Sequence, residues 1–293
     1  YLRVLSLTDP AHNTQVKIQN NASEELLLSS VSASIDDSAS NPFTAVQNVL
    51  ATSAARIGGA FNILDVILDT SAFIQTAGPC PSPNVGCIPP KVTVYWEPGS
   101  KEGTFFNDGI DAISILGGGG FGGDTDEYDD VVIIHEYGHF ILSKFSRDDS
   151  PGGDHNLFDN GQDIRLSWSE GWGNFLPFAV LNSPLYVDTI PGGVGISFNI
   201  EDYSTSQPGN PLSASAIYTT NEIAVAGVLW DLLDGLDNGE SDSLDLTFTQ
   251  IFQTVLNFPQ TKPATMETFW TTFSVGASTA VFNPEFQAIL LAR

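Results

Sequence analysis

Basic side chains are scarce in this 293-residue chain. Ten Lys and Arg residues stand against 35 Asp and Glu residues, which gives a formal net charge of −25. A surface with this balance repels nucleic-acid phosphates and anionic lipid headgroups, so we expect neither kind of partner. The sequence also lacks an uninterrupted apolar run long enough to cross a bilayer, and no membrane span is expected.

Cysteine is nearly absent, because Cys80 and Cys87 are the only two. The loop between them is rich in proline and contains a glycine, which favours a tight turn that brings the sulfur atoms together. A local disulfide is typical of an oxidising compartment, so we expect an extracellular protein, either secreted or at the cell surface. A pair of free thiols is the alternative. The two cysteines alone would make a poor structural zinc site.

The first part of the chain mixes strand and helix patterns. Short alternating segments predict strands, and apolar residues three or four positions apart predict a helix. Gly58 and Gly59 are expected to end or bend that helix. Residues 1–40 are either part of the main sheet or a separate β-segment. The expected strands cover residues 2–7, 15–18, 26–35, 61–76, 91–97 and 109–116, and the expected helix covers residues 42–57.

A longer helix is expected over residues 124–145. Asp124 followed by Glu127 fits a capping box, and Lys144 suits the carboxyl end of a helix. The patterns predict an α+β fold with an N-terminal lobe over residues 1–145 and a mostly helical C-terminal lobe over residues 146–293. Further helices are expected over residues 166–182, 219–234, 246–257 and 264–279.

The long helix contains the pattern H-E-x-x-H, from His135 to His139. Two positions four apart lie just over one helical turn apart, so both imidazoles project from one face and can hold one metal ion. Glu136 is placed beside the metal, where its carboxylate can take a proton from the water that the metal activates. The pattern predicts a zinc hydrolase with two histidine ligands and Glu136 as general base.

A catalytic zinc needs a third protein ligand and an open position. The metzincin pattern is excluded, because it requires a glycine and a histidine where Leu142 and Phe145 stand. Glu170 is the favoured third ligand, and Asn174 lies four residues further on the same helix face, where it can orient a ligand imidazole. The rival third ligands are Asp148, Asp149, Asp154 and His155.

The two motifs, His-Glu-Tyr-Gly-His and Ser-Glu-Gly-Trp-Gly-Asn-Phe, resemble those of the gluzincin zinc peptidases. This group includes thermolysin, the clostridial collagenases and the fungalysins. The fungalysins are especially similar, since they join a His-Glu-Tyr-x-His motif to a Glu-Gly-Trp-x-Asp-Phe segment that supplies the glutamate ligand. Asn174 replaces the aspartate here, and the connection between the motifs is longer. The resemblance implies a zincin-like two-lobe fold, one catalytic zinc, and a secreted endopeptidase that acts on proteins or peptides.

The resemblance extends to Tyr218, four residues before Glu222. Fungalysins carry a histidine at this position that donates a hydrogen bond to the transition state, and other gluzincins use a tyrosine. The resemblance therefore implies that Tyr218 stabilises the oxyanion, with His155 as the alternative. We expect the substrate to lie extended between the lobes and to pair with the strand near residues 110–116.

Three weaker interpretations stay open. The acidic segment 231–242 could bind calcium, but it lacks the EF-hand spacing and a solvated loop is favoured. The chain could be a metal-containing binding or adhesion module without turnover, although the intact Glu136 argues against this. It could also be a zinc hydrolase of a non-peptide amide, such as a deformylase-like enzyme, but Cys80 and Cys87 lack the context of that enzyme's cysteine ligand.

Overall fold

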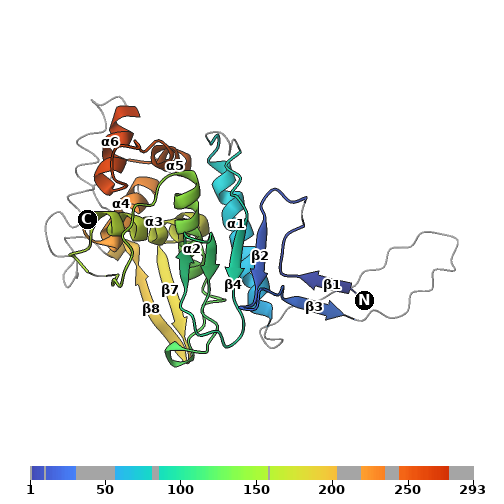
Figure 1. Cartoon of the computed structure of the whole chain (residues 1–293). Helices are drawn as coiled ribbons and strands as arrows, with labels where there is room; N and C mark the ends of the chain where they lie inside the picture. The colour runs from blue at the N-terminus through green and yellow to red at the C-terminus, as the bar shows by residue number, and fades with distance from the viewer. Residues whose placement is uncertain are drawn as a thin grey trace.

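The computed structural model describes residues 2–9, 11–30, 57–80, 86–157, 159–202, 219–234 and 244–276. These residues form a mixed α+β architecture built on a four-stranded sheet with the order β2-β4-β6-β5 (Figure 1). Strands β2, β4 and β6 are parallel, and β5 pairs with β6 antiparallel at one edge. The four strands are β2 (Val16–Gln19), β4 (Val92–Tyr95), β5 (Phe105–Asn107) and β6 (Ala112–Ser114).

Six α-helices lie in the described part of the chain, and helix α3 packs between α2 and α4. Two separate antiparallel ribbons complete the fold, one near the N-terminus and one below the helices in Figure 1. The helices are α1 (Gly58–Thr76), α2 (Asp130–Phe145), α3 (Ile164–Leu181), α4 (Glu222–Asp234), α5 (Phe248–Leu256) and α6 (Met266–Gly276). The ribbons pair β1 (Leu2–Leu5) with β3 (Leu27–Ser30), and β7 (Leu185–Ile190) with β8 (Gly193–Asn199). Short 3-10 helices cover Phe121–Gly123 and Ile200–Asp202.

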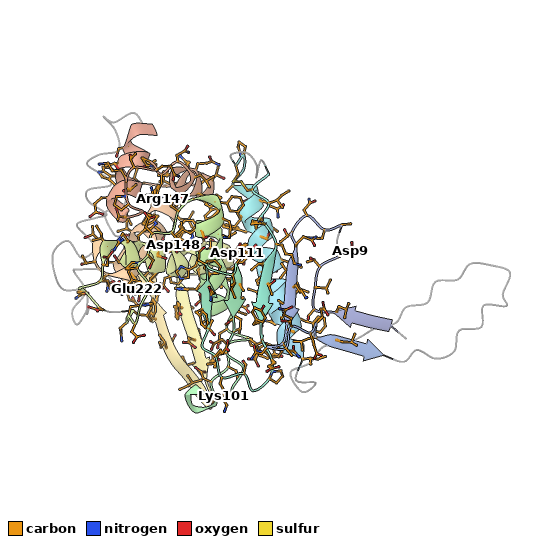
Figure 2. The ribbon with its side chains drawn as sticks, viewed as in Figure 1. Asp9, Lys101, Asp111, Arg147, Asp148 and Glu222 are labelled. Carbon is orange, nitrogen blue, oxygen red and sulfur yellow. A yellow bond between two sulfur atoms is a disulfide. The ribbon has the colours of Figure 1, made fainter. Side chains whose placement is uncertain are left out.

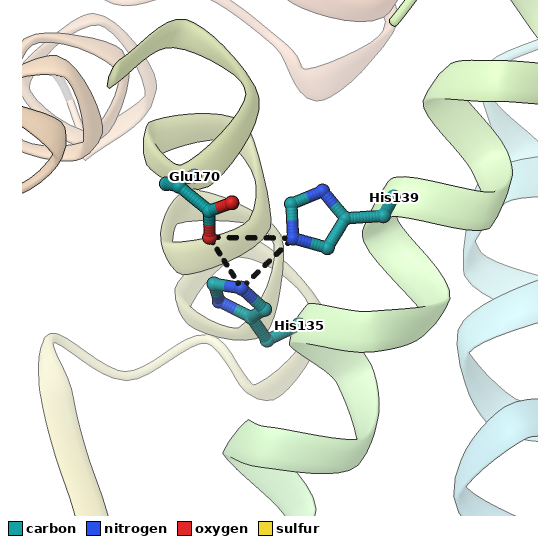
Figure 3. A group of neighbouring side chains, drawn as sticks. All are labelled: His135, His139 and Glu170. Atoms are coloured by element: carbon teal, nitrogen blue, oxygen red, sulfur yellow. Dashed lines mark hydrogen bonds and ion pairs between the residues drawn. The ribbon is translucent and has the colours of Figure 1, made fainter. Parts of the chain in front are cut away.

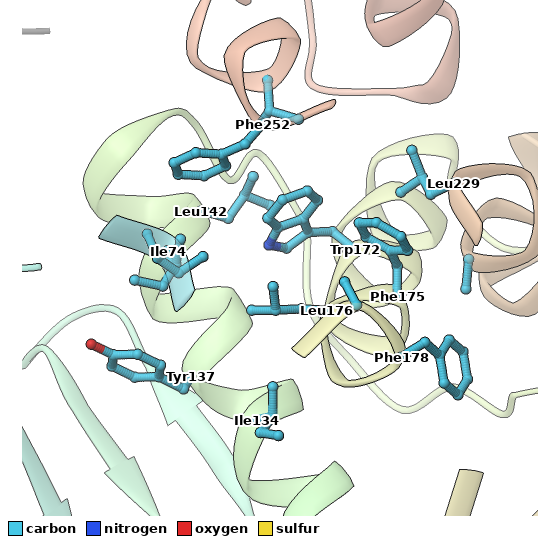
Figure 4. Packing of buried hydrophobic residues seen from close by; sticks show 14 of the residues in the cluster. Ile74, Ile134, Tyr137, Leu142, Trp172, Phe175, Leu176, Phe178, Leu229 and Phe252 are labelled. Carbon is cyan, nitrogen blue, oxygen red and sulfur yellow. The ribbon is translucent and has the colours of Figure 1, made fainter. Parts of the chain in front are cut away.

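One apolar core joins the sheet to the helices on both sides of residue 145. Trp172 of α3 is completely buried, with Leu142 of α2 and Phe252 of α5 on one side of it and Phe175 on the other (Figure 4). Its ring stacks on that of Phe252 with centroids 6.0 Å apart, and its indole N–H donates to the Gly138 carbonyl at 3.2 Å. This packing fixes α3 against α2, the helix that carries the H-E-x-x-H motif.

Residues 61–76 belong to helix α1, so the expected strand over this segment is wrong. Its buried residues include Ile63, Ile67 and Ile74, which are spaced for one face of a helix. Their β-branched side chains favour strands as isolated residues, but burial of this face against the sheet decides the conformation. The expected helix over residues 42–57 falls almost entirely outside the described residues.

Gly58 and Gly59 are the first residues of helix α1, and almost all of the segment that they were expected to end or bend lies outside the described residues. A Cβ atom added at Gly59 would lie 2.4 Å from the Cγ atom of Glu127 and 2.7 Å from the Trp96 ring. This glycine therefore allows α1 to approach the segment before α2 closely.

Helix α2 begins at Asp130, six residues later than expected, with Asp129 as its N-cap residue. The capping box of Asp124 and Glu127 is therefore wrong. The segment before the helix is held in another conformation, because the Asp126 N–H donates to the Leu116 carbonyl at 3.1 Å and Thr125 forms a bridge with Gly117. Residues 125 and 126 therefore bond to the segment that continues strand β6, and this pairing replaces the capping box that the sequence suggested.

The other expected elements agree with the structure except in two places. Strands β1 to β4 and helices α3 to α6 lie within or close to their expected ranges. The expected strand over residues 109–116 is shortened to Ala112–Ser114, because a turn at Asp111, with φ of 53°, joins it to the unexpected strand β5. The β7–β8 ribbon was not expected in the largely helical second half.

The expected disulfide between Cys80 and Cys87 is present, with an S–S distance of 2.12 Å. It closes the loop between helix α1 and strand β4. Across the described ranges, no helix combines the length and the apolar character that a membrane crossing requires.

Candidate metal centre

Helices α2 and α3 bring three potential metal ligands together (Figure 3). The Nε2 atoms of His135 and His139 are 3.0 Å apart. The Oε2 atom of Glu170 lies 3.2 Å from Nε2 of His135 and 3.4 Å from Nε2 of His139. Glu170 comes from the adjacent helix α3, so two crossing helices form the cluster.

These separations fit a tetrahedral zinc ion. Bonds of about 2.0–2.1 Å from zinc to nitrogen and oxygen ligands place neighbouring ligands about 3.3 Å apart in a tetrahedron. The three observed distances, 3.0, 3.2 and 3.4 Å, bracket that value. The three side chains also line a cleft of about 490 Å³, which leaves a fourth position open to a water molecule or a substrate.

Asn174 holds the His135 ring from the side away from the cluster. Its Oδ1 atom lies 3.1 Å from Nδ1 of His135, and its side chain is completely buried in helix α3. An amide oxygen only accepts, so this hydrogen bond requires the ring proton to be on Nδ1. The Nε2 atom of His135 is then free to bind a metal, as expected from the position of Asn174 four residues after Glu170.

His139 is held by a chain of two side chains. Its Nδ1 atom lies 3.1 Å from the Ser169 hydroxyl, which donates to the Asp148 carboxylate at 2.7 Å. Burial acts to raise the pKa of Asp148, but its hydrogen bond and charge interaction with His139 outweigh burial and lower the pKa. Asp148, a rival third ligand in sequence, therefore lies 3.7 Å from Nδ1 of His139, the nitrogen that points away from the cluster. The role of Ser169 was not predicted, although it precedes Glu170 directly.

The Glu170 carboxylate is almost completely buried among histidines. Burial acts to raise its pKa, but the charge of His139 and hydrogen bonds from the neighbouring imidazoles outweigh burial and hold the pKa well below its ordinary value. The three imidazoles therefore favour the ionised form of Glu170.

Glu136 faces the same cleft, beside the metal-ligand cluster. The backbone N–H of Phe106, in strand β5, donates to its Oε2 atom at 2.8 Å. The edge of the sheet therefore holds the carboxylate that the sequence assigns as general base. This contact was not predictable from the sequence, because strand β5 itself was not expected.

Two glycines of α3 allow the helices to approach each other near the cluster. A Cβ atom added at Gly173 would lie 2.8 Å from the His135 ring, closer than real contacts allow. A Cβ atom added at Gly171 would lie 2.3 Å from a methyl group of Val225 in α4. The glycines between Glu170 and Asn174 therefore make room for the His135 ring on one side and for α4 on the other.

His155 also lies on the cleft, in the connection between the two motifs. Its Nε2 atom is 3.3 Å from Glu170 and 3.6 Å from Glu222, and its Nδ1 atom is 3.0 Å from the Gly153 carbonyl. The hydrogen bond with Glu170 raises the pKa of His155 to about 9. His155 is thus close enough to the cluster to contact a bound substrate.

The remaining sequence candidates lie elsewhere or outside the described residues. Asp149 pairs with Arg147, and Asp154 is exposed. Tyr218 and most of the acidic segment 231–242 fall outside the described residues. The substrate was expected to pair with residues 110–116, but this segment contains β6, which already pairs with a strand on each side. The edge strand of the sheet is β5.

Glu222 is a further residue of the site that the sequence did not reveal. It begins helix α4, it is completely buried, and neither of its carboxylate oxygens has a hydrogen-bond partner. Burial, with a contribution from the charge of Glu170, raises the pKa of Glu222 to about 7. In the sequence analysis Glu222 was used only to locate Tyr218, because the neighbouring residues give no sign that Glu222 is buried.

Comparison with known proteins places these features in a family. Residues 84–283, more than half of the chain, match the mycolysin C-terminal domain. The extracellular metalloproteinase mep of Aspergillus niger is 28% identical over 110 residues, which make up 35% of this chain and 17% of that protein. A protein of Archaeoglobus fulgidus described as uncharacterized is 31% identical over 121 residues, 40% of this chain and 32% of that protein.

The chain thus spans less than a third of the length of either relative in the matched regions. The family match and the fungal relative together support a relation to fungalysin-like metallopeptidases, as the two motifs suggested. Because the match covers both motifs and most of the helices around them, this chain belongs to the mycolysin C-terminal domain family.

Proposed function

We propose that this protein is a secreted zinc-dependent endopeptidase of the gluzincin type. The observation that carries the proposal is the arrangement of His135, His139 and Glu170, whose ligand atoms lie 3.0 to 3.4 Å apart beside Glu136. The relation to an extracellular metalloproteinase and the disulfide support secretion and peptidase activity. The proposal includes one catalytic zinc ion, and calcium binding by the acidic segment 231–242 stays open beside the favoured interpretation as a solvated loop.

The residues around the cluster divide the chemistry between them. When bound, zinc supplies a Lewis acid that polarises the scissile carbonyl and makes water acidic enough to lose a proton near neutral pH. Glu136 accepts that proton and passes it to the leaving amine. The Phe106 N–H holds one oxygen of this carboxylate, so the other oxygen is available for the proton transfers. Asn174 and Ser169 hold the two ligand rings in place.

The substrate is proposed to lie extended along the edge strand β5, in the cleft of about 490 Å³. Tyr218 is the proposed donor to the oxyanion on the basis of the resemblance, and His155, which lines the cleft, is the alternative. The division into two lobes near residue 145 is part of the same proposal, since the cleft is lined by residues on both sides of that position.

Elemental analysis combined with a cleavage assay tests the proposed function. We expect one zinc per chain, and we expect cleavage of casein that a chelator abolishes and added zinc restores. Zinc without cleavage of any unstructured protein would favour the binding or adhesion module. Cleavage restricted to small non-peptide amides would favour the deformylase-like alternative, and a folded, undialysed protein without metal would overturn the proposal.

A single substitution separates metal binding from turnover. Glu136→Gln keeps the shape of the side chain and removes the proton acceptor, so we expect full zinc content and a loss of activity of about 10²–10⁴-fold. Glu102→Gln is the matched control, because the same change is made at an exposed position of the surface. A Glu136→Gln variant that cleaves casein as fast as the control would contradict the assigned role.

A further inference from the structure

A side pocket of about 180 Å³ adjoins the metal-ligand cluster. Cavities that enclose whole ligands measure roughly 300–1,000 Å³, so this pocket has room for a single side chain. His135 and Glu136 form part of its wall. A side chain that fills the pocket must therefore belong to a residue next to the bond that Glu136 helps to cleave.

His155 and Asn174 are among the polar residues that line the pocket, and three further residues give it a largely apolar wall. Val132 of α2, Leu157 of the connecting segment and Tyr186 of β7 line it. The Tyr186 ring is stacked on Phe198 with centroids 5.0 Å apart, so the β7–β8 ribbon fixes this wall. Such a wall suits the methylene groups of a long side chain.

Glu222 provides the charged end of the pocket. Its backbone N–H donates to the Gln162 side chain at 3.1 Å, which fixes the start of α4, but both of its carboxylate oxygens lack hydrogen-bond partners. A buried carboxylate without partners is unfavourable, and a cation that enters the pocket would relieve this cost.

The described part of the chain supplies no lysine or arginine for this carboxylate. None of the ion pairs of those residues includes Glu222, and Figure 2 shows Lys101 and Arg147 away from it. The nearest basic group is Nε2 of His155 at 3.6 Å, which is beyond hydrogen-bond distance and lies closer to Glu170. Glu222 thus has one long ion pair with His155, and both of its carboxylate oxygens remain without a hydrogen-bond donor among the described residues, so they can accept hydrogen bonds from a cation that enters the pocket.

We propose that this pocket binds a lysine or arginine side chain of the substrate next to the scissile bond, and that Glu222 pairs with its cation. The inference rests on the proposed peptidase function and names its substrate class. The apolar wall holds the methylene stem, and the ammonium or guanidinium group donates charge-assisted hydrogen bonds to Glu222. A leucine would leave the buried carboxylate without a hydrogen-bond donor, and a glutamate would add a second negative charge. The net charge of −25 also attracts basic peptides.

Matched peptides test this subsite. Peptides that differ only in having Lys, Arg, Leu or Glu next to the cleaved bond are compared by kcat/KM, and mass spectrometry locates the cut. We expect Lys and Arg to exceed Leu by at least about tenfold. Glu222→Gln should lose this preference, whereas Glu25→Gln, the same change at an exposed position, should keep it. Equal cleavage of the Lys and Leu peptides would overturn the subsite and leave the peptidase function intact.

A binding experiment decides the question independently of turnover and of the Glu222 substitution. Glu136→Gln is titrated by calorimetry with the Lys peptide and its Leu counterpart, and we expect binding of the Lys peptide to be at least about tenfold tighter. Leu157→Lys places a competing cation at the pocket wall and should abolish the difference without removing Glu222. Equal affinities before this second substitution would overturn the subsite, whereas a failure of casein cleavage alone would count only against the peptidase function.

Discussion

Asn174 approaches the metal-ligand cluster as a neutral amide, at a position where the similar fungalysin segment carries an aspartate. Its oxygen accepts the same hydrogen bond from His135 that a carboxylate would accept, at 3.1 Å. It adds no negative charge to a site that already contains Glu136 and Glu170. The amide therefore orients the ring without making His135 as basic as a carboxylate would.

Removal of the Asn174 amide should weaken zinc binding. We expect Asn174→Ala to lower zinc affinity by about 10–100-fold, because the His135 ring loses its orientation and its fixed proton. Asn174→Asp should restore affinity at least to the original level, because the carboxylate accepts the same hydrogen bond. Competition with a chromogenic zinc chelator measures both, and Asn20→Ala, far from the site in the N-terminal segment, is the control. Unchanged affinity in Asn174→Ala would contradict this role.

The sequence predicts those site residues that share one helix. His135, Glu136 and His139 follow from spacing within a single helical turn, and Asn174 follows from Glu170 in the same way. Contacts between elements were not predictable. The Phe106 N–H that holds Glu136 and the pocket end formed by Glu222 depend on an edge strand and a helix crossing that no local pattern encodes.

At the scale of elements, the crossing of α3 and α4 requires a glycine. A Cβ atom added at Gly171 would lie 2.3 Å from Val225 and 2.9 Å from the Glu222 carbonyl. The facing glycine in α2, Gly138, is less crowded, since its added Cβ would meet its nearest neighbours at 3.4 Å. The two positions therefore differ in packing although both lie inside helices.

This difference predicts opposite responses to alanine. Gly171→Ala should destabilise the protein by about 1–3 kcal/mol, because overpacking outweighs the gain in helix propensity. Gly138→Ala should be neutral or stabilising by up to about 1 kcal/mol, because propensity dominates where the contact is ordinary. Denaturant unfolding of the zinc-free proteins measures both changes. Equal stability of the two variants would show that the helices can separate at Gly171 without cost.

The misread elements have a common physical cause. Helix α1 contains many β-branched residues, and its face against the sheet is revealed only by burial. The β7–β8 ribbon and strand β5 are short or partly exposed, so they give weak alternation in the sequence. Helix α5 shows the opposite case, because one apolar face and the capping box of Thr247 and Gln250 mark it in the sequence.

At the scale of the whole molecule, acidic residues are so numerous that some of their carboxylates are partly or fully buried. Asp124, Asp126 and Asp188 bring carboxylate oxygens within 4.8 Å of one another where the β7–β8 ribbon meets the segment before α2. Among the described residues, no Lys or Arg forms an ion pair with them. Burial is the main cause that raises the pKa of Asp126 to about 7 and that of Asp188 to about 6, and their neighbours' charges add to it.

These pKa values predict that stability falls as the pH rises through the weakly acidic range. The folded protein holds a proton on Asp126 up to a pH of about 7, whereas the ordinary pKa of an aspartate is 3.8. The folded state therefore binds more protons than the unfolded state between these values, and the free energy of unfolding decreases as the pH rises from about 4 to about 7. Above about pH 7 the free energy of unfolding stays at its lower value, because Asp126 is then ionised in both the folded and the unfolded state.

Asp126→Asn should remove the contribution of Asp126 to this dependence, because the amide carries no charge and can still accept the hydrogen bond from Thr104. We expect the variant to be more stable than the original protein by about 1–3 kcal/mol at pH 8, after allowance for screening, and to differ little at pH 4. Asp65→Asn, at an exposed position of α1, removes the same charge and serves as the control. Denaturant unfolding at both pH values measures the difference. If the two variants gain the same stability at pH 8, the effect comes from the net charge of the whole molecule, and Asp126 is not the group that titrates.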